Sequence, residues 1–208
     1  MSDLDKQSQE NVAGNYYNKY ESQNPIAQWL TRNFKSNLLA LIAKTGAKDI
    51  HELGCGEGYL SVYINDYFQP ERFRASDFSV EIIETAKLMH GGQGVEFVQG
   101  SIYDITEQDR AQLMICCEVL EHLEEPEEAL QKIQSVAPEY AVFSVPREPL
   151  WRMTNMARFQ YLSDLGNTPG HLQHWSKRGF TQMISDYFEI IEVRSPYPWT
   201  MLLCRPRV

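Results

Sequence analysis

The order of apolar segments predicts one α/β domain built on a doubly wound, Rossmann-like sheet. Apolar runs of strand length alternate with segments of helical periodicity from about residue 34 onward, which indicates a mostly parallel sheet with helices on both faces. A glycine-rich turn, His51-Glu52-Leu53-Gly54-Cys55-Gly56-Glu57-Gly58, follows the first strand-like run. The last two strand-like runs are joined only by residues 195–198, so short a connection that the final strand must be antiparallel.

The expected elements follow one another in a regular order. Apolar residues at helical spacing predict a first helix that ends near Gly46; they are Phe34, Leu38, Leu41 and Ile42. The expected strands are 48–53, 72–76, 95–99, 113–117, 140–146, 188–194 and 199–205. The expected helices lie near 58–68, 79–89 and 126–136, with a further one after Ser176, and an irregular stretch follows strand 95–99.

Size and composition favour a single domain that acts on small molecules. The chain has 208 residues, of which 43% are hydrophobic, enough for one full core over 1–208. Its formal net charge of -9 repels a nucleic-acid backbone, so no nucleic-acid partner is expected. The sequence offers no apolar run of membrane-spanning length and no secretory leader, and its cysteines lack metal-ligand spacing. We therefore expect reduced thiols and a cytoplasmic protein.

The glycine turn has the features of a nucleoside site. Its spacing is G-x-G-x-G and it lacks the Lys-Ser/Thr ending of a P-loop, which disfavours a diphosphate ligand. Asp77 ends the next strand about 20 residues further on, where an acidic side chain accepts hydrogen bonds from ribose hydroxyls. Adenosine fits both features. The alternatives are a tight turn without a ligand and a helix-capping role for Asp77, although Ser79 would cap that helix equally well.

Taken together, the pattern resembles the class I S-adenosylmethionine-dependent methyltransferases from about Phe34 onward. Residues 52–58 resemble their first motif and Asp77 their ribose-binding acid. Residues 116–123, Cys-Cys-Glu-Val-Leu-Glu-His-Leu, resemble their fourth-strand motif, especially in the branch that includes ubiquinone-pathway O-methyltransferases. Ser101 departs from the family, because an aspartate that contacts adenine is common at this position.

The resemblance implies S-adenosylmethionine as cofactor and transfer of a methyl group to an acceptor, most simply an oxygen of a small molecule. It implies a cofactor site at the carboxyl ends of the first four strands, made of Glu52, Gly54, Cys55, Gly56, Asp77, Phe78, Ser101, Ile102, Cys117 and Glu118. For Ser101 and Ile102 an ordinary strand end is an equal alternative. A catalytically idle cofactor-binding module and a nicotinamide oxidoreductase are other functions compatible with a Rossmann-like fold.

His122 is the candidate general base, because it follows the carboxyl end of the fourth strand, where open α/β sheets place their ligands. We expect no metal. The alternative rests on a similarity to small-RNA terminal 2′-O-methyltransferases, in which a Glu-x-x-Glu-His sequence and a later histidine hold a divalent ion. The corresponding residues here are Glu118, Glu121, His122 and His171, with His174 as a substitute for the last.

Two segments are expected to choose the acceptor. Residues 147–175 form an insertion after the fifth strand and are expected to make a lid, and about 1–33 are expected to cover the site. The candidate acceptor-binding residues are aromatic or basic: Tyr16, Tyr20, Arg147, Trp151 and Arg152. A small extra core with a solvated arginine face is the alternative interpretation of the lid.

Overall fold

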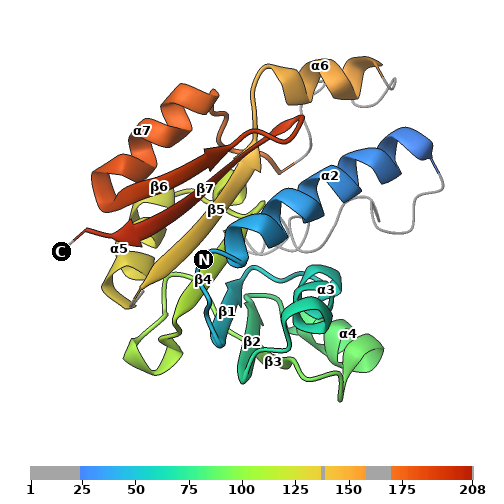
Figure 1. The fold of residues 1–208 in the computed structure, drawn as a ribbon, viewed down its shortest axis with the longest axis vertical. Helices are drawn as coiled ribbons and strands as arrows, with labels where there is room; N and C mark the ends of the chain where they lie inside the picture. Colours follow the sequence, from blue (N-terminus) through green and yellow to red (C-terminus); the bar gives the residue numbers. More distant parts are fainter. Residues whose placement is uncertain (1–23, 137–138, 158–169, 208) are drawn as a thin grey trace, which may run out of the picture.

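The protein is described from a computed structural model, which covers residues 24–136, 139–157 and 170–207. Seven strands form one sheet in the order β3-β2-β1-β4-β5-β7-β6 (Figure 1). Five strands are parallel: β1 (Asp49–Leu53), β2 (Arg72–Asp77), β3 (Glu96–Gln99), β4 (Leu113–Cys117) and β5 (Tyr140–Pro146). The last two, β6 (Phe188–Arg194) and β7 (Trp199–Pro206), are antiparallel to each other, and β7 is also antiparallel to β5. The predicted fold class is confirmed.

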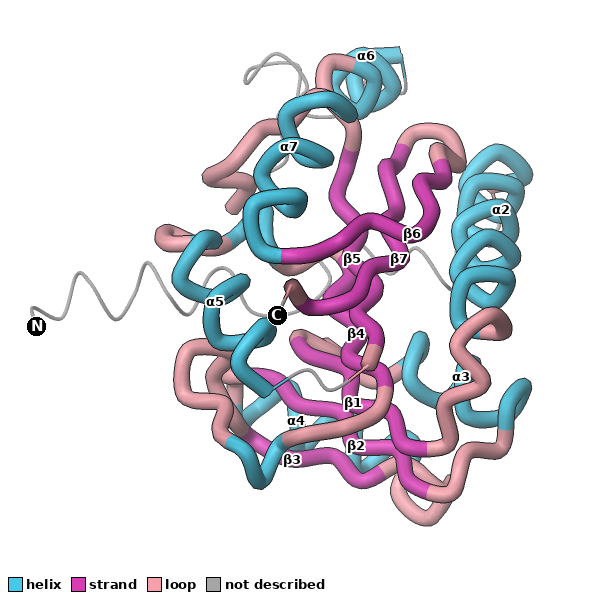
Figure 2. Tube along the Cα trace, turned by 60° about the vertical axis from the view of Figure 1, so that its left-hand side comes forward, coloured by secondary structure: helices cyan, strands magenta, loops and turns pink. Residues whose placement is uncertain are grey.

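Helices cover both faces of this sheet, as Figure 2 shows from the side. On one face lie α2 (Pro25–Ile42), α3 (Tyr59–Phe68) and α4 (Val80–His90), packed over buried residues such as Ile50, Phe73 and Ala75. On the other face lie α5 (Pro126–Val136) and α7 (Lys177–Tyr187), packed over Met114 and Phe143. Successive side chains of a strand point to opposite faces of the sheet. Because helices cover both faces, β4 and β5 are buried along nearly their whole length.

The first helix starts earlier than its apolar pattern predicts. Helix α2 begins at Pro25, because Asn24 accepts the N–H two residues further on and caps the helix, and proline at the first helical position needs no hydrogen-bond partner. In its first turns only Ala27 and Leu30 are buried, so the apolar stripe is too narrow there to be recognised. The expected boundary near residue 33 therefore falls inside α2.

The regions expected to be irregular also contain short helices. A 3₁₀ helix, η1 (Glu107–Asp109), lies between β3 and β4, and another, η2 (Leu120–His122), follows β4. The expected lid contains α6 (Leu150–Ala157) directly after β5. None of the helices in the described residues is long and apolar enough to cross a membrane.

The strand order determines where a ligand can bind. After β3 the chain crosses back over β2 and β1 to form β4, so β1 and β4 are neighbours whose connections leave in opposite directions. Open α/β sheets bind ligands at the carboxyl ends of the strands at this switch point. The glycine turn after β1, the end of β2 and the η2 segment after β4 all lie at this edge.

Candidate active site

The glycine turn after β1 is held against the end of β2. The N–H groups of Gly54 and Cys55 donate to the Ser76 carbonyl at 2.7 and 3.0 Å. Gly54, Gly56 and Gly58 have positive φ angles of 72, 55 and 83°, a region that side chains other than glycine rarely adopt. The turn thus takes a shape that its glycines make accessible.

At two of these positions a side chain would also clash with a neighbouring residue. A Cβ atom on Gly54 would lie 2.3 Å from Cγ2 of Val119, and one on Gly58 would lie 2.6 Å from the Phe97 ring. Gly54 therefore lets the β4 loop approach the β1 turn, whereas Gly58 lets α3 begin beside β3. These close approaches bring the ends of the parallel strands together.

Asp77 is fixed by the same turn. Its Oδ2 accepts the Gly56 N–H and its Oδ1 accepts the Ser79 N–H, each at 3.1 Å. Burial raises the pKa of Asp77, and the hydrogen bonds from Ser79 and Gly56 oppose that rise. The two carboxylate oxygens together offer about four lone-pair sites, more than the backbone N–H groups of Gly56, Phe78 and Ser79 occupy. Ser79 accepts the Ile82 N–H and caps α4, so Asp77 is not needed as the cap.

Glu52 and Cys55, two predicted cofactor residues, are buried. Ser61 donates to Glu52 Oε2 at 2.5 Å, and burial raises the pKa of Glu52 to about 7, with the Asp77 charge adding to the rise. Burial likewise raises the pKa of the Cys55 thiol. Cys55 therefore offers its backbone at the turn rather than a reactive thiolate.

The loop after β3 lies next to Asp77. The Gly100 N–H donates to the Asp77 carbonyl at 2.9 Å. Ser101 accepts the Tyr103 N–H at 3.2 Å through its hydroxyl, and Ile102 packs partly against the core on the α5 side. Phe78 is 50% exposed at this edge, the exposure expected of a side chain available to a flat ligand.

At the end of β4, beyond the buried Cys117, Glu118 adopts a positive φ of 60°. Its N–H donates to the Ser144 carbonyl at 3.0 Å and its Oε1 accepts the Ser144 hydroxyl at 3.1 Å. Its Oε2 accepts the indole N–H of Trp199 at 2.6 Å. The Glu118 carboxylate therefore lies toward β5 and β7.

His122 lies at the end of η2, and a ring nitrogen contacts the segment that follows α6 of the lid. Its Nδ1 is 2.9 Å from the Gly170 carbonyl oxygen. A carbonyl only accepts hydrogen bonds, so in the neutral imidazole Nδ1 carries the proton and Nε2 carries the lone pair. This is the tautomer that a general base at Nε2 requires.

Three of the four residues in the metal alternative come together. One ligand atom each from Glu121, His122 and His171 lies within 4.8 Å of the others. Glu118 does not share a helical face with them, because its positive φ breaks the turn that the spacing assumed, and in the described part of the chain it is not a member of this cluster. One carboxylate with two imidazoles is a donor set that suits a first-row transition metal.

The described part of the lid borders this cluster. Trp151 of α6 stacks on the His171 ring with centroids 6.2 Å apart and also contacts Trp199 at 5.7 Å. Arg147 and Arg152 are both half-buried. The backbone N–H of Arg147 donates to the Pro198 carbonyl. Tyr16 and Tyr20 lie outside the described residues.

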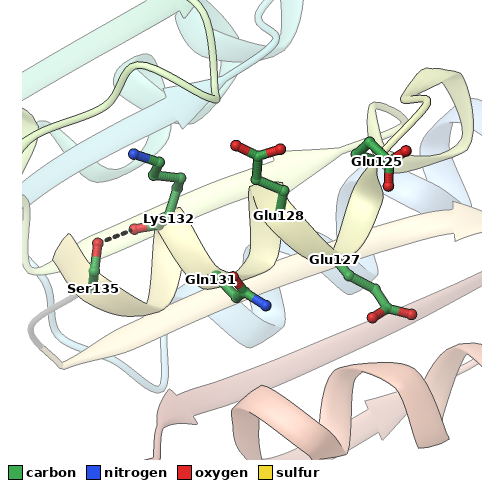
Figure 3. A pocket seen from close by; sticks show the side chains of 6 residues that line it. All are labelled: Glu125, Glu127, Glu128, Gln131, Lys132 and Ser135. Atoms are coloured by element: carbon green, nitrogen blue, oxygen red, sulfur yellow. Dashed lines mark hydrogen bonds between the residues drawn. The ribbon is translucent and has the colours of Figure 1, made fainter.

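A separate hollow on α5 does not have the features of a catalytic site (Figure 3). Its lining comes from one helix and the residue before it: Glu125, Glu127, Glu128, Gln131, Lys132 and Ser135. The two acidic residues Glu127 and Glu128 lie in the first turn of α5, where negative charge complements the helix dipole. We assign this hollow no chemistry.

Trp199 and Ser144 are the residues at this edge that the sequence did not indicate. Trp199 lies 81 positions beyond Glu118 and Ser144 lies 26 beyond it, so no local spacing connects them. The apolar pattern of β7 assigned Trp199 to a strand without indicating a partner for its indole N–H.

Comparison with known proteins finds a family-level similarity in the part of the chain that contains the glycine turn and the end of β4. Residues 51–140 match the family model described as "Methyltransferase domain". Over this stretch the chain is similar to methyltransferase domains. A search of curated protein sequences finds no match.

Solved structures of methyltransferases share the fold over most of the chain. The N-methyltransferase NodS from Bradyrhizobium japonicum WM9, in complex with S-adenosyl-L-homocysteine, has a TM-score of 0.69 at 17% identity over 97% of this chain and 98% of its own. Magnesium protoporphyrin IX methyltransferase from Synechocystis PCC 6803 with bound SAH has a TM-score of 0.67 at 16% identity, covering 99% and 95%. The methyltransferase domain of a bacterial Hen1 has a TM-score of 0.64 at 19% identity, covering 85% and 99%.

Proposed function

We propose that this methyltransferase domain transfers the methyl group of S-adenosylmethionine to an oxygen of a small-molecule acceptor, with His122 as the general base. The observation that carries the proposal is the hydrogen bond between His122 Nδ1 and the Gly170 carbonyl, which leaves Nε2 as the basic atom. His122 lies just beyond the end of β4, at the ligand-binding edge of the sheet.

The cofactor would lie across the ends of β1, β2 and β4. Asp77 has lone pairs for the ribose hydroxyls, the positive-φ turn at Gly56 exposes backbone, and Glu118 offers a carboxylate to the cationic methionine part. The sulfonium is an already activated donor, so catalysis consists mainly of alignment, which contributes up to about 7–11 kcal/mol in favourable cases. A base at an acceptor hydroxyl adds roughly 10²–10⁴-fold.

We further propose that residues 1–208 form a single domain in which 147–175 act as the acceptor lid and about 1–33 as the cover. Support comes from α6 and Trp151, which lie next to His171 of the site cluster. The net charge of -9 favours a small molecule over a nucleic acid. Four buried free cysteines suit the reducing cytoplasm.

A second candidate function is metal-assisted methylation of an RNA end. The cluster of Glu121, His122 and His171 favours it, because these three side chains could hold a divalent cation beside the acceptor. The acidic chain argues against it, since RNA binding relies on phosphate contacts from basic groups. We therefore place it second.

The two functions make opposite predictions about chelation. If His122 is a metal-free base, His122→Ala should lower turnover roughly 10²–10⁴-fold while cofactor affinity is kept, and EDTA should leave the wild type unchanged. The assay is methyl transfer from labelled S-adenosylmethionine across phenols, carboxylates, amines, sugar derivatives and short RNAs. His174→Ala, which alters an exposed histidine outside the cluster, is the matched control.

If the cluster holds a metal, EDTA should abolish transfer and added Mn²⁺ or Mg²⁺ should restore it. His171→Ala and Glu121→Ala should then reproduce the loss seen with His122→Ala. Activity that tolerates both EDTA and His122→Ala would refute both roles of His122 and leave alignment alone as the mechanism.

A further inference from the structure

Trp199 contacts Glu118 at the end of β4 and also packs against helices α2 and α6. The indole is 3% exposed, and its Nε1–H donates to Glu118 Oε2 at 2.6 Å. The ring contacts Phe34 of α2 edge-on at 5.0 Å between centroids and Trp151 of α6 at 5.7 Å. Its orientation is therefore fixed by packing from both sides.

Glu118 needs such support because of its backbone. A non-glycine residue with a φ of 60° is uncommon, and it persists where the surrounding structure holds it in that conformation. Here Ser144 binds both the backbone N–H and one carboxylate oxygen, and Trp199 binds the other oxygen. The carboxylate is thus fixed at both oxygens by donors from β5 and β7.

A fixed carboxylate is useful beside a cation. Hydrogen bonds from an indole N–H and a hydroxyl stabilise the ionised form of the carboxylate. A preorganised anion also binds a cationic group with little loss of side-chain entropy.

We propose that Trp199 is a positioning residue that holds the Glu118 carboxylate in place for the cationic methionine part of S-adenosylmethionine. This inference rests on the proposed cofactor role of Glu118. It assigns to the last strand of the sheet a role in cofactor binding, although β7 lies outside the matched family region of 51–140.

The test compares cofactor affinity in Trp199→Phe, Glu118→Ala and the double variant by calorimetry. Phenylalanine keeps the contacts with Phe34 and Trp151 but removes the N–H donor. Trp199→Phe should weaken S-adenosylmethionine binding about tenfold, the scale for losing a hydrogen bond to a charged group, and should raise the KM for the cofactor while the KM for the acceptor stays the same. In the Glu118→Ala background the same change should alter affinity less than about twofold.

Trp175→Phe is the matched control, since Trp175 packs against Phe180 on the opposite face of the sheet and should leave cofactor affinity unchanged. Ser144→Ala removes the other donor and should also weaken cofactor binding. Equal losses from Trp199→Phe with and without Glu118, or a change in the acceptor KM alone, would overturn the inference. Unchanged affinity in Glu118→Ala would instead refute the proposed cofactor role of Glu118 itself.

Discussion

At the scale of single residues, two neighbours on β1 respond to pH in opposite directions. Burial lowers the pKa of His51, whose ring nitrogens lie 2.9 Å from the Asp109 carbonyl and 3.0 Å from the Ser76 hydroxyl. The folded state therefore binds fewer protons at His51 than the unfolded state does, and stability from this residue is lost as pH falls below about 6.5. The pKa of Glu52 is raised instead, so its contribution to stability changes with pH in the opposite direction.

Burial raises the pKa of Glu52 from 4.5 to about 7. The contribution of Glu52 to folding stability is therefore fully present below pH 4.5 and is lost as the pH rises through about 7. That difference corresponds to about 3 kcal/mol. Glu52→Gln should therefore gain stability over the wild type by up to this amount at pH 8 relative to pH 4.5. Urea unfolding of the cofactor-free proteins at both pH values measures it, and an equal difference at both would contradict a raised pKa.

The second prediction at this scale concerns Asp77. Asp77→Asn removes the charge and places an amide against one of the two N–H donors, so cofactor binding should weaken by about 1.5–3 kcal/mol. Calorimetry with S-adenosylmethionine tests this, and Asp66→Asn on the exposed side of α3 is the control. A folded Asp77→Asn protein with wild-type affinity would remove Asp77 from the cofactor site.

At the level of elements, Gly54 in the turn after β1 has both a positive φ angle and a close neighbour, Val119. Substitutions can separate the effects of these two features on stability. Gly54→Ala should be destabilising for two reasons: a positive φ costs about 1–2 kcal/mol, and overpacking against Val119 adds about 1–3 kcal/mol. Gly92→Ala isolates the first cost, because Gly92 has a φ of 82° and nothing within 4 Å of the added Cβ. In denaturant unfolding, Gly54→Ala should lower the free energy of unfolding more than Gly92→Ala does. Adding Val119→Ala to Gly54→Ala should restore part of the lost stability. Equal effects would show that the close approach to Val119 is easily relieved.

At the level of the whole molecule, residues 170–173, which follow α6 of the lid, pack against the end of β4 and contribute His171 to the candidate active site. The N–H groups of Leu172 and Gln173 donate to the Glu121 carbonyl at 2.8 and 3.0 Å, and the Gln173 amide donates to the Leu123 carbonyl at 3.2 Å. These bonds place His171 next to His122, with ring centroids 4.9 Å apart. The segment after the lid is thereby attached to the end of β4.

Gln173→Ala should loosen this attachment and misplace His122, which lowers kcat or raises the acceptor KM roughly 10- to 100-fold while cofactor affinity stays unchanged. Gln131→Ala, on the exposed face of α5, is the control. Steady-state kinetics with both substrates varied separates the two effects. A change confined to cofactor affinity would contradict this role for the segment.

Features that depend on residues close together in the chain can be predicted from the sequence. Alternating apolar runs indicate the strands, and the glycine spacing with Asp77 indicates a nucleoside site, because these signals are periodicities and local spacings. The sequence leaves the cap of α4 open between Asp77 and Ser79, and the structure shows that Ser79 is the cap. The start of α2 was missed because only a few of its early residues face the core.

Contacts between groups that are distant in the sequence are visible only in the folded protein. Glu118 was expected to share a helical face with Glu121 and His122, but Ser144 and Trp199 hold it elsewhere, and the segment from Gly170 reaches His122 across 48 positions. Such pairings are set by strand order and by the packing of side chains across the sheet, and neither leaves a fixed spacing in the sequence.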